Sequence, residues 1–279
     1  MKIAFATSRD FADGHHDDLE AARLAGADFR VWNDPAVQWQ RYDRVVIRST
    51  WDYTTQLDAY LDWCQTVGPE RLRNRPDLVN FSSDKRYLDQ LRAPTVPTIF
   101  VAEGDPLPRL SGEVVVKPTV SAGARDAGRF SPARHDDATA LIDAIHDSGR
   151  TAMVQPYLAR VDELGETTII YIGGEPSHAV RKQPVLRADA PTKRIANPAA
   201  GQRTVITATE PTEVEWRLAD AVHTEIAERF SAPLYARIDL IPGHDGEPVV
   251  SELELIEPHL FLGHSPLAAR RLADAIHES

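Results

Sequence analysis

Short apolar runs alternate with longer amphipathic stretches over the first 80 residues. The expected elements here are strands at residues 2–6, 28–32 and 42–48 and helices at residues 17–25 and 57–67. Strands that alternate with helices favour a parallel sheet, and such sheets bind ligands at the carboxyl ends of their strands. We therefore predict an N-terminal α/β domain over residues 1–80, with a polar binding edge at residues 7–10 and 48–53.

Beyond residue 80 the pattern predicts a central domain over residues 81–154 and a C-terminal domain over residues 155–279. After a turn-rich connector, the expected elements are a short helix at 84–91, strands at 113–118, 152–155, 167–172, 178–182, 237–240 and 250–257, and helices at 136–148, 212–230 and from 266 onward. This mixture predicts the α/β class, with α+β character in parts. Residues 187–203 lack such a pattern, and a loop this long is usually functional or disordered.

Composition narrows the classes of function. Of the 279 residues 42% are hydrophobic and 26% charged, as is ordinary for a globular protein. The net charge of −11 argues against a general nucleic-acid-binding surface. No apolar run reaches the ~18 residues of a membrane span, and the first six residues lack a signal-peptide core, so we expect a cytoplasmic protein without membrane partners. The single cysteine, Cys64, excludes an internal disulfide, and its apolar helical surroundings predict packing.

The segment from Val250 to Glu257 carries an unusual acidic pair. Side chains alternate between the two faces of a strand, so Glu252 and Glu254 share one face while Leu253 points into the core. Two neighbouring carboxylates repel each other unless a cation lies between them. Asp239, on the preceding apolar strand, completes an oxygen-rich site suited to Mg²⁺. The alternative is the polar face of a solvated sheet.

Two other segments have the composition of nucleotide-binding elements. Lys117 ends an apolar strand and precedes a loop of small residues that includes Ser121 and Gly123. Small residues let backbone N–H groups approach phosphate oxygens, and the ammonium offsets their charge. The spacing is not that of a Walker loop, and a surface hairpin with an incidental lysine is the alternative.

The second segment is the apolar strand that ends at Gln155. Its exposed backbone would hydrogen-bond an adenine edge, and Glu163 or Glu166 would hold the ribose hydroxyls. Ordinary turn charges are the alternative for these two glutamates.

Taken in order along the chain, these segments resemble the ATP-grasp superfamily. The matching stretches are Asp84-Lys85, the strand ending at Lys117-Pro118, the small-residue loop, residues 154–158, Gly165-Glu166, residues 179–182, Arg237-Ile238-Asp239 and Glu252-Leu253-Glu254. Residues 48–53 and 257–262 resemble the branch that contains glutathione synthetase and the RimK-type ligases. The resemblance implies an N-terminal parallel-sheet domain followed by a central and a C-terminal domain that enclose ATP.

The resemblance also implies a role for individual residues. For ATP, the resemblance implies that the phosphates are bound by Lys85, Lys117, Ser121 and Gly123, the adenine by Gln155, Tyr157 and Leu158, and the ribose by Glu166. Arg181 and Lys182 would lie near the transferred phosphoryl group, and two Mg²⁺ ions would be bound by Asp239, Glu252 and Glu254. Arg194 and Asn197 would belong to a segment that closes over the site. One position departs from the family pattern. The last metal ligand is usually asparagine, and here it is Glu254, with Glu257 close enough to share its role.

The implied reaction is ATP-dependent joining of a carboxylate to an amine through an acylphosphate. Phosphoryl transfer needs positioning and charge neutralisation, for which Lys182 and Arg194 are candidates, and Arg237 is the candidate donor to the oxyanion. We place Arg48, Ser49, Tyr53 and Arg181 around a small-molecule substrate. The nitrogen nucleophile belongs either to a second amine, as in peptide-type ligases, or to the same molecule, as in the branch members that form the antibiotic cycloserine.

Several alternatives stay open from sequence alone. The chain is a ligase, a nucleotide-binding protein without catalysis, or a small-molecule kinase. The resemblance also implies a homodimer, because many family members are homodimers. His15, His16, Asp17 and Asp18 form either a polar helix start or part of a substrate site, with the helix cap favoured. His259 and His264 either contact substrate or are polar surface or core residues, and Trp51 and Tyr53 line either the substrate pocket or a domain interface.

Overall fold

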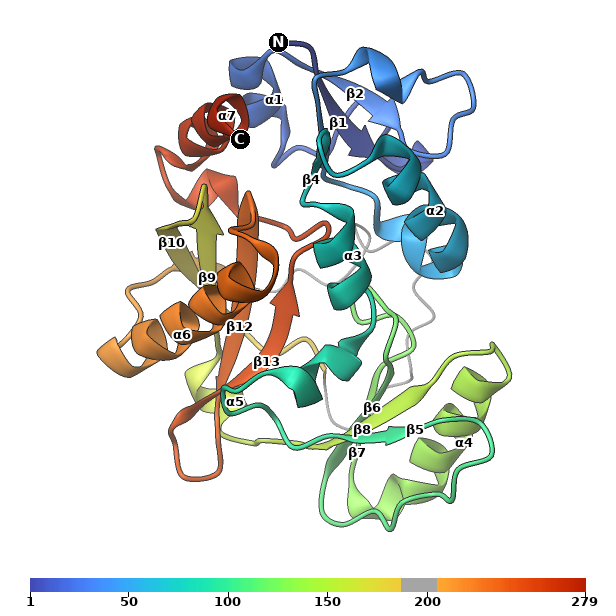
Figure 1. The fold of residues 1–279 in the computed structure, drawn as a ribbon. Helices are drawn as coiled ribbons and strands as arrows, with labels where there is room; N and C mark the ends of the chain where they lie inside the picture. Colours follow the sequence, from blue (N-terminus) through green and yellow to red (C-terminus); the bar gives the residue numbers. More distant parts are fainter. Residues whose placement is uncertain (187–204) are drawn as a thin grey trace.

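The computed structural model describes residues 1–186 and 205–279, and its three β-sheets follow one another along the chain (Figure 1). The first sheet has the order β2-β1-β3-β4 and its pairs are all parallel. Its strands are β1 (Ile3–Thr7), β2 (Ala27–Val31), β3 (Arg44–Ile47) and β4 (Leu72–Arg73). The predicted N-terminal parallel sheet is confirmed.

Helices α1 (Leu19–Ala25), α2 (Leu57–Val67) and α3 (Pro76–Ser82) accompany this sheet, together with the 3₁₀ turns η1 (Arg9–Phe11), η2 (Trp39–Arg41) and η3 (Trp51–Thr55). The inner face of α2 buries Tyr60, Trp63 and Cys64 in an aromatic cluster with Trp32. Cys64 is fully buried, which confirms that it is a packing residue. Burial also raises the pKa of its thiol, so the reactive thiolate is disfavoured.

The second sheet is antiparallel, with the order β5-β8-β6-β7. Its strands are β5 (Ile99–Val101), β6 (Val114–Pro118), β7 (Gly128–Phe130) and β8 (Ala152–Pro156). Helix α4 (His135–His146), preceded by the turn η5 (Pro132–Arg134), packs its apolar face on the sheet through Leu141, Ile142 and Ile145. Lys117 and Gln155 lie on the adjacent strands β6 and β8.

The third sheet is also antiparallel, with the order β11-β10-β9-β12-β13. Its strands are β9 (Glu166–Ile172), β10 (Glu175–Lys182), β11 (Ile206–Ala208), β12 (Tyr235–Pro242) and β13 (Pro248–Glu254), and its helices are α5 (Val161–Leu164), α6 (Glu213–Phe230) and α7 (Ala268–Glu278), with the turn η7 (Leu262–His264). Helix α6 begins at a capping box, in which the Thr212 side chain and Glu215 each satisfy a backbone N–H of the other. None of the described helices is long and apolar enough to cross a membrane.

The structure departs from the sequence prediction mainly at short elements. The helix expected at 84–91 is the 3₁₀ helix η4 (Lys85–Gln90), and α3, β4, β5, β7 and β11 were not expected. These elements span two to seven residues, too few for an apolar period to emerge. The boundary drawn between residues 154 and 155 falls within β8, and the three-domain division stays a prediction.

The first and third sheets share one hydrophobic core. Ile3 and Phe5 of β1 pack with Ile170 of β9 and with Leu272 and Ile276 of α7. In Figure 1, α7 lies beside α1 although the two helices are at opposite ends of the chain, and the two are in direct contact. The N-terminal part is therefore held against the third sheet by apolar packing.

Asn74 adds hydrogen bonds to this apolar packing between the N-terminal part and the third sheet. It follows β4 and is 1% exposed. Its Nδ2 donates to the carbonyl oxygens of Tyr235 and Leu255 at 2.8 and 2.7 Å, and its Oδ1 accepts from the backbone N–H of Leu234 at 2.7 Å. One side chain thus satisfies three backbone groups of the third sheet and the segment that follows it.

We expect Asn74→Ala to lower the free energy of unfolding by about 3 kcal/mol, because it leaves three buried backbone groups unpaired. Urea denaturation followed by circular dichroism measures the loss. Asn80→Ala, at an exposed position of α3, is the matched control and is expected to change stability by less than about 0.5 kcal/mol. Equal effects of the two substitutions would contradict this role for Asn74.

Candidate functional site

A cavity of about 580 Å³ lies where the second and third sheets meet the end of the first. This volume is in the range of small-molecule sites. Polar side chains from widely separated parts of the sequence line it, among them Lys85, Lys117, Gln155, Glu166, Lys182, Arg237, Asp239, Glu252, Glu254 and Glu257. The fold therefore gathers most of the predicted site residues into one cavity.

The acidic cluster is built by the pairing of β12 and β13. Asp239 lies opposite Glu252 and Arg237 lies opposite Glu254, so the four side chains share one face of the sheet. Leu253, between the two glutamates, is 1% exposed and faces the core, as predicted. Carboxylate oxygens of Asp239, Glu252 and Glu254 lie within 4.8 Å of one another.

Cations separate these carboxylates. The Nζ atom of Lys182 lies 3.1 Å from Asp239, and that of Lys117 lies 2.9 Å from Glu252. The Arg237 guanidinium donates to Asp239 at 2.8 Å and also pairs with Glu254. On the other side, the Thr168 hydroxyl on β9 donates to Asp239 at 2.7 Å. The cationic side chains of the protein thus offset the mutual repulsion of the carboxylates.

The local charges set different proton affinities along the cluster. Although burial acts in the opposite direction, Arg237 and Lys182 hold the pKa of Asp239 well below its ordinary value. Lys117 and Lys85 likewise outweigh burial and lower the pKa of Glu252 to about 2. Burial dominates at Glu254, where the pKa is raised to about 7, and at Glu257, where burial and the charge of Glu254 raise it to about 8.

The donor set fits a hard divalent cation. Oxygen-only ligands from three carboxylates suit Mg²⁺, and two of the three are ionised at neutral pH. Glu257 lines the same cavity but is not part of the group whose oxygens converge within 4.8 Å. The geometry therefore favours Glu254 over Glu257 as the third ligand.

The small-residue loop after β6 closes one side of the cavity. Ser121 and Gly123 line it, and Lys85 donates to the Ser121 carbonyl oxygen at 2.9 Å and to its hydroxyl at 3.2 Å. Gly123 has a φ of +63°, a conformation that a residue with a side chain rarely adopts. Lys85 and Lys117 thus both line the cavity beside this loop, and their role toward phosphate stays a prediction.

Strand β8 and the residues after it form the opposite wall. Gln155, Tyr157 and Leu158 all line the cavity. The Gln155 amide is oriented by the Thr98 hydroxyl, to which its Nε2 donates at 2.9 Å. The guanidinium of Arg129 lies 3.4 Å from the centre of the Tyr157 ring, which fixes that ring in place. The three residues that the resemblance assigned to adenine are therefore brought together.

The two acidic residues near the α5 turn have different surroundings. Glu166 begins β9, lines the cavity and pairs with Lys182 at 2.6 Å, and burial raises its pKa to about 7 against the charge of that lysine. Glu163 is exposed on α5 and is not among the residues that line the cavity. Gly165 is required beside them, since its φ is +74° and a Cβ atom would approach the Lys182 carbonyl oxygen to 2.9 Å.

Arg181 and Lys182 do not act together, which corrects one prediction. They are consecutive residues of β10 and therefore point to opposite faces. Lys182 faces the acidic cluster, whereas Arg181 donates to the Leu164 carbonyl oxygen at 2.8 Å and lies 3.6 Å from Glu215 of α6. Arg181 is not among the residues that line the cavity.

Two of the predicted substrate residues also have other partners. Arg48 is 2% exposed and pairs with Asp18 at 2.8 Å, while the Ser49 hydroxyl donates to the other oxygen of Asp18 at 2.8 Å. The predicted polar helix start at Asp18 is confirmed in position, although its side chain is used by Arg48 and Ser49. Asp18 occupies the first position before α1, but its carboxylate makes no cap hydrogen bond. Tyr53, in contrast, does line the cavity.

His15, Trp51 and His259, for which the sequence left a place at the substrate open, line the far end of the cavity. Other contacts were beyond sequence reasoning. Thr168 and Tyr87 support the acidic strands, the latter by accepting the Leu253 N–H at 2.8 Å, and Phe261 lines the far end of the cavity. Only strand register and long-range packing bring these groups together, and neither leaves a local signal. Arg194 and Asn197 lie outside the described residues, although Leu186 and Ile206, on either side of that segment, line the cavity.

Comparison with known proteins agrees with this architecture. Residues 3–74 match the N-terminal domain of the D-cycloserine synthetase DcsG, and residues 87–250 match the ATP-grasp domain of prokaryotic glutathione synthetase. The cycloserine biosynthesis protein DcsG of Streptomyces lavendulae is 34% identical over 278 residues, covering 93% of this chain and 91% of that protein.

The chain belongs to the DcsG family of ATP-grasp ligases.

The crystal structure of D-cycloserine synthetase DcsG agrees with this family fold over the whole chain, with a TM-score of 0.85, 29% identity and coverage of 100% and 99% of the two chains. The ATP-grasp ligase PsnB, complexed with a phosphomimetic variant of its minimal precursor, Mg and ADP, has a TM-score of 0.59 at 14% identity, with coverage of 100% and 98%. At that identity the likeness shows the fold alone. The ATP-grasp fold and the ligase class predicted from sequence are confirmed.

The opposite orientation of Arg181 and Lys182 gives a matched pair of substitutions. In this DcsG-family ligase we expect Lys182→Ala to lower kcat/KM for ATP by at least about 10²-fold, because a cation beside the acidic cluster is lost. Arg181→Ala is expected to change it by less than about 3-fold, since its partners lie outside the cavity. Steady-state ADP release measures both. A larger effect at Arg181 than at Lys182 would contradict the orientation of β10.

Proposed function

We propose that this ligase activates a carboxylate as an acylphosphate, and that it closes the ring of O-ureido-D-serine to form D-cycloserine. The observation that carries the proposal is the acidic cluster of Asp239, Glu252 and Glu254 with Lys117, Lys182 and Arg237 between its members. Such an arrangement suits the transfer of a phosphoryl group, which needs charge neutralisation and alignment more than covalent help. Similarity to DcsG over most of the chain supports the substrate.

ATP is proposed to lie with its phosphates under the Ser121–Gly123 loop and its base against β8. Lys85 and Lys117 would pair with the phosphates, and Gln155, Tyr157 and Leu158 would surround the adenine. Glu166 is the candidate for the ribose hydroxyls, because it is the acidic residue of the α5 turn that lines the cavity. Mg²⁺, held by Asp239, Glu252 and Glu254, would neutralise charge on the phosphates when bound.

The protein's own groups account for the carboxylate chemistry. The γ-phosphoryl group of ATP passes to a substrate carboxylate oxygen, giving ADP and an acylphosphate. Arg237, buried beside the cluster, would hold that carboxylate and then donate to the oxyanion formed on attack. Lys182 lies at the same point and would offset the negative charge on the transferred group.

Ring closure requires a nucleophile within the activated molecule. The nitrogen bound to the side-chain oxygen of O-ureido-D-serine attacks the acyl carbon, the C–N bond forms, and inorganic phosphate leaves with the C–O bonding pair. The nitrogen proton passes to a base or to solvent. Because the ring nitrogen of cycloserine carries hydrogen, water must also remove the carbamoyl group, as carbon dioxide and ammonia. A peptide-type ligase would instead admit a second amine.

We expect ADP and phosphate release only when a suitable acid is present, with D-cycloserine identified by mass when that acid is O-ureido-D-serine. Asp239→Ala and Glu252→Ala should each lower turnover by at least about 10³-fold, because either change removes a group that neutralises or orients the phosphates. Glu247→Ala, an exposed carboxylate between β12 and β13, is the control and should retain activity.

Three outcomes would redirect the proposal. A stable phosphorylated product that resists hydroxylamine would indicate a kinase, whereas an acyl-hydroxamate would support the acylphosphate. ATP binding without consumption under every acid tested would indicate a non-catalytic protein. Full turnover in both Asp239→Ala and Glu252→Ala would remove the proposed metal site.

The raised pKa of Glu254, about 7, predicts a pH-dependent metal affinity. Below pH 7 the carboxyl is protonated in the metal-free protein, so Mg²⁺ must displace a proton, and the apparent Kd should rise by up to about tenfold per pH unit. Calorimetric Mg²⁺ titration of the ADP complex between pH 6 and 8 measures it. Glu254→Gln should flatten the dependence, and Glu257→Gln should keep it. The reverse result would assign the ligand to Glu257.

Two further sequence predictions remain proposals. We expect a homodimer, as is common among family members, and sedimentation velocity would measure the oligomeric state of this chain. A cytoplasmic location agrees with the proposed chemistry, because the cytoplasm supplies both ATP and Mg²⁺.

A further inference from the structure

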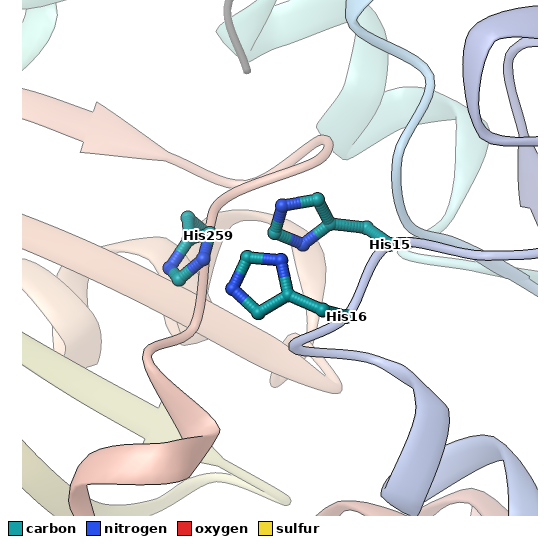
Figure 2. A group of neighbouring side chains, drawn as sticks. All are labelled: His15, His16 and His259. Atoms are coloured by element: carbon teal, nitrogen blue, oxygen red, sulfur yellow. The ribbon is translucent and has the colours of Figure 1, made fainter. Parts of the chain in front are cut away.

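Three histidines meet at the end of the cavity that lies beyond Arg237 (Figure 2). His15 and His16 come from the loop before α1, His259 comes from the segment after β13, and their rings lie close together where these two segments meet. The ring centre of His15 lies 4.0 Å from that of His16 and 5.2 Å from that of His259. His15 and His259 line the cavity, whereas His16 is exposed to solvent.

Backbone contacts indicate which ring nitrogen carries the proton. The Nδ1 atom of His15 accepts the Asp17 N–H at 3.4 Å, and the Nδ1 atom of His259 accepts the Phe261 N–H at 3.3 Å. A neutral imidazole whose Nδ1 accepts a hydrogen bond has its hydrogen on Nε2. Burial, assisted by the neighbouring rings, lowers the pKa of His15 and lowers that of His259 to about 3, so both are neutral at physiological pH.

This protonation pattern disfavours a metal. The three rings do place nitrogen atoms within 4.8 Å of one another, as a metal site would. A metal ligand, however, must offer a free lone pair. In His15 and His259 the Nδ1 lone pair is already used by a backbone N–H, and Nε2 carries hydrogen. The edge of each ring that is left for the cavity is therefore a hydrogen-bond donor.

The surroundings select the charge of the group that these donors receive. Two N–H donors repel an ammonium group. An anion is also disfavoured, because Asp17 has a buried Oδ2 atom without a hydrogen-bond partner among the described residues, 3.7 Å from the Nδ1 atom of His259, and Glu257 lines the same cavity. The nearby cations are Arg48, which Asp18 neutralises, and Arg237, which pairs with Asp239 and Glu254. A neutral oxygen acceptor fits this environment better than either ion.

The donors are close to the reacting end of the cavity. The Nη1 atom of Arg237 donates to the backbone carbonyl oxygen of His259 at 3.5 Å, and its guanidinium lies 5.8 Å from the Phe261 ring centre. The same guanidinium contacts Asp239 and Glu254. A molecule whose carboxylate lies at Arg237 therefore presents its side chain to the histidines. Trp51, edge-on to His15 at 5.1 Å, adds an aromatic wall suited to a planar group.

We propose that His15 and His259 form a carbonyl-binding subsite, in which their Nε2–H groups donate to the oxygen of a neutral, planar ureido substituent on the amino-acid substrate. The inference rests on the proposed function for the identity of the substrate. The arrangement of the two histidine donors does not depend on that proposal. The subsite would distinguish a ureido compound from the corresponding aminooxy compound, which has the same carboxylate and the same oxygen-bound nitrogen but lacks the carbonyl.

The first experiment compares O-ureido-D-serine with O-amino-D-serine in steady-state ADP release. His259→Leu and His15→Leu should each raise KM for the ureido compound by about tenfold and leave KM for the aminooxy compound within about twofold, because only the former loses a buried hydrogen bond. His259→Gln, which keeps a donor near the position of Nε2, should restore much of the loss. His16→Leu, at the exposed ring, should affect neither compound. An equal loss for both compounds would overturn the proposal.

The second experiment does not require turnover, so it separates failure of the subsite from failure of the proposed function. Long-range ¹H–¹⁵N spectra of histidine-labelled protein at pH 7.5 report the tautomer of each ring. We expect Nε2–H forms for His15 and His259, and shifts at both rings when methoxyurea, the ureido fragment alone, is added. Nδ1–H or charged rings, or no response to methoxyurea, would overturn the subsite. So would stoichiometric Zn²⁺ binding that is abolished in His16→Leu.

Discussion

The site depends on how Asp239 is neutralised. This carboxylate, on β12 of the third sheet, is 1% exposed, and an isolated buried charge would not be tolerated there. Arg237, Lys182 and Thr168 together satisfy it. Removing one member of a buried ion pair typically costs about 3–5 kcal/mol. The arrangement of cations in the cavity is therefore a condition of folding as well as of chemistry.

The same constraint explains why strands from distant parts of the chain must be in register. Asp239 meets Glu252 on one side and Thr168 on the other only because β12 pairs with both β13 and β9. The cavity is completed from outside this sheet. Lys117 reaches Glu252 from β6, and the N-terminal part adds Trp51, whose indole N–H donates to the Glu257 carbonyl oxygen at 3.1 Å. Binding surface and stability thus come from the same contacts.

Sequence alone could predict the fold class, the strands that carry the site and the charged residues that line the cavity. The strands follow from local patterns, and the charged residues follow from the resemblance to the ATP-grasp superfamily. The alternation in Glu252-Leu253-Glu254 is enough to place both glutamates on one face. Sequence reasoning failed where the answer depended on partners far along the chain. Arg48 was expected to contact the substrate because it follows a parallel strand, but its side chain pairs with Asp18, which no local pattern could reveal. Arg181 was misplaced although the alternation of β10 already separated it from Lys182.

The pairing of cations with carboxylates has a consequence for the ligand-bound state. Lys117 and Lys182 now serve Glu252 and Asp239. In the proposed complex the lysines would turn to the phosphates of the nucleotide, and Asp239 and Glu252 would hold a divalent cation whose charge replaces that of the lysines. Each buried charge then keeps an opposite neighbour throughout the exchange. Such an exchange avoids the cost of an unpaired charge in either state, and it explains how a cavity this rich in acids is stable before it binds anything.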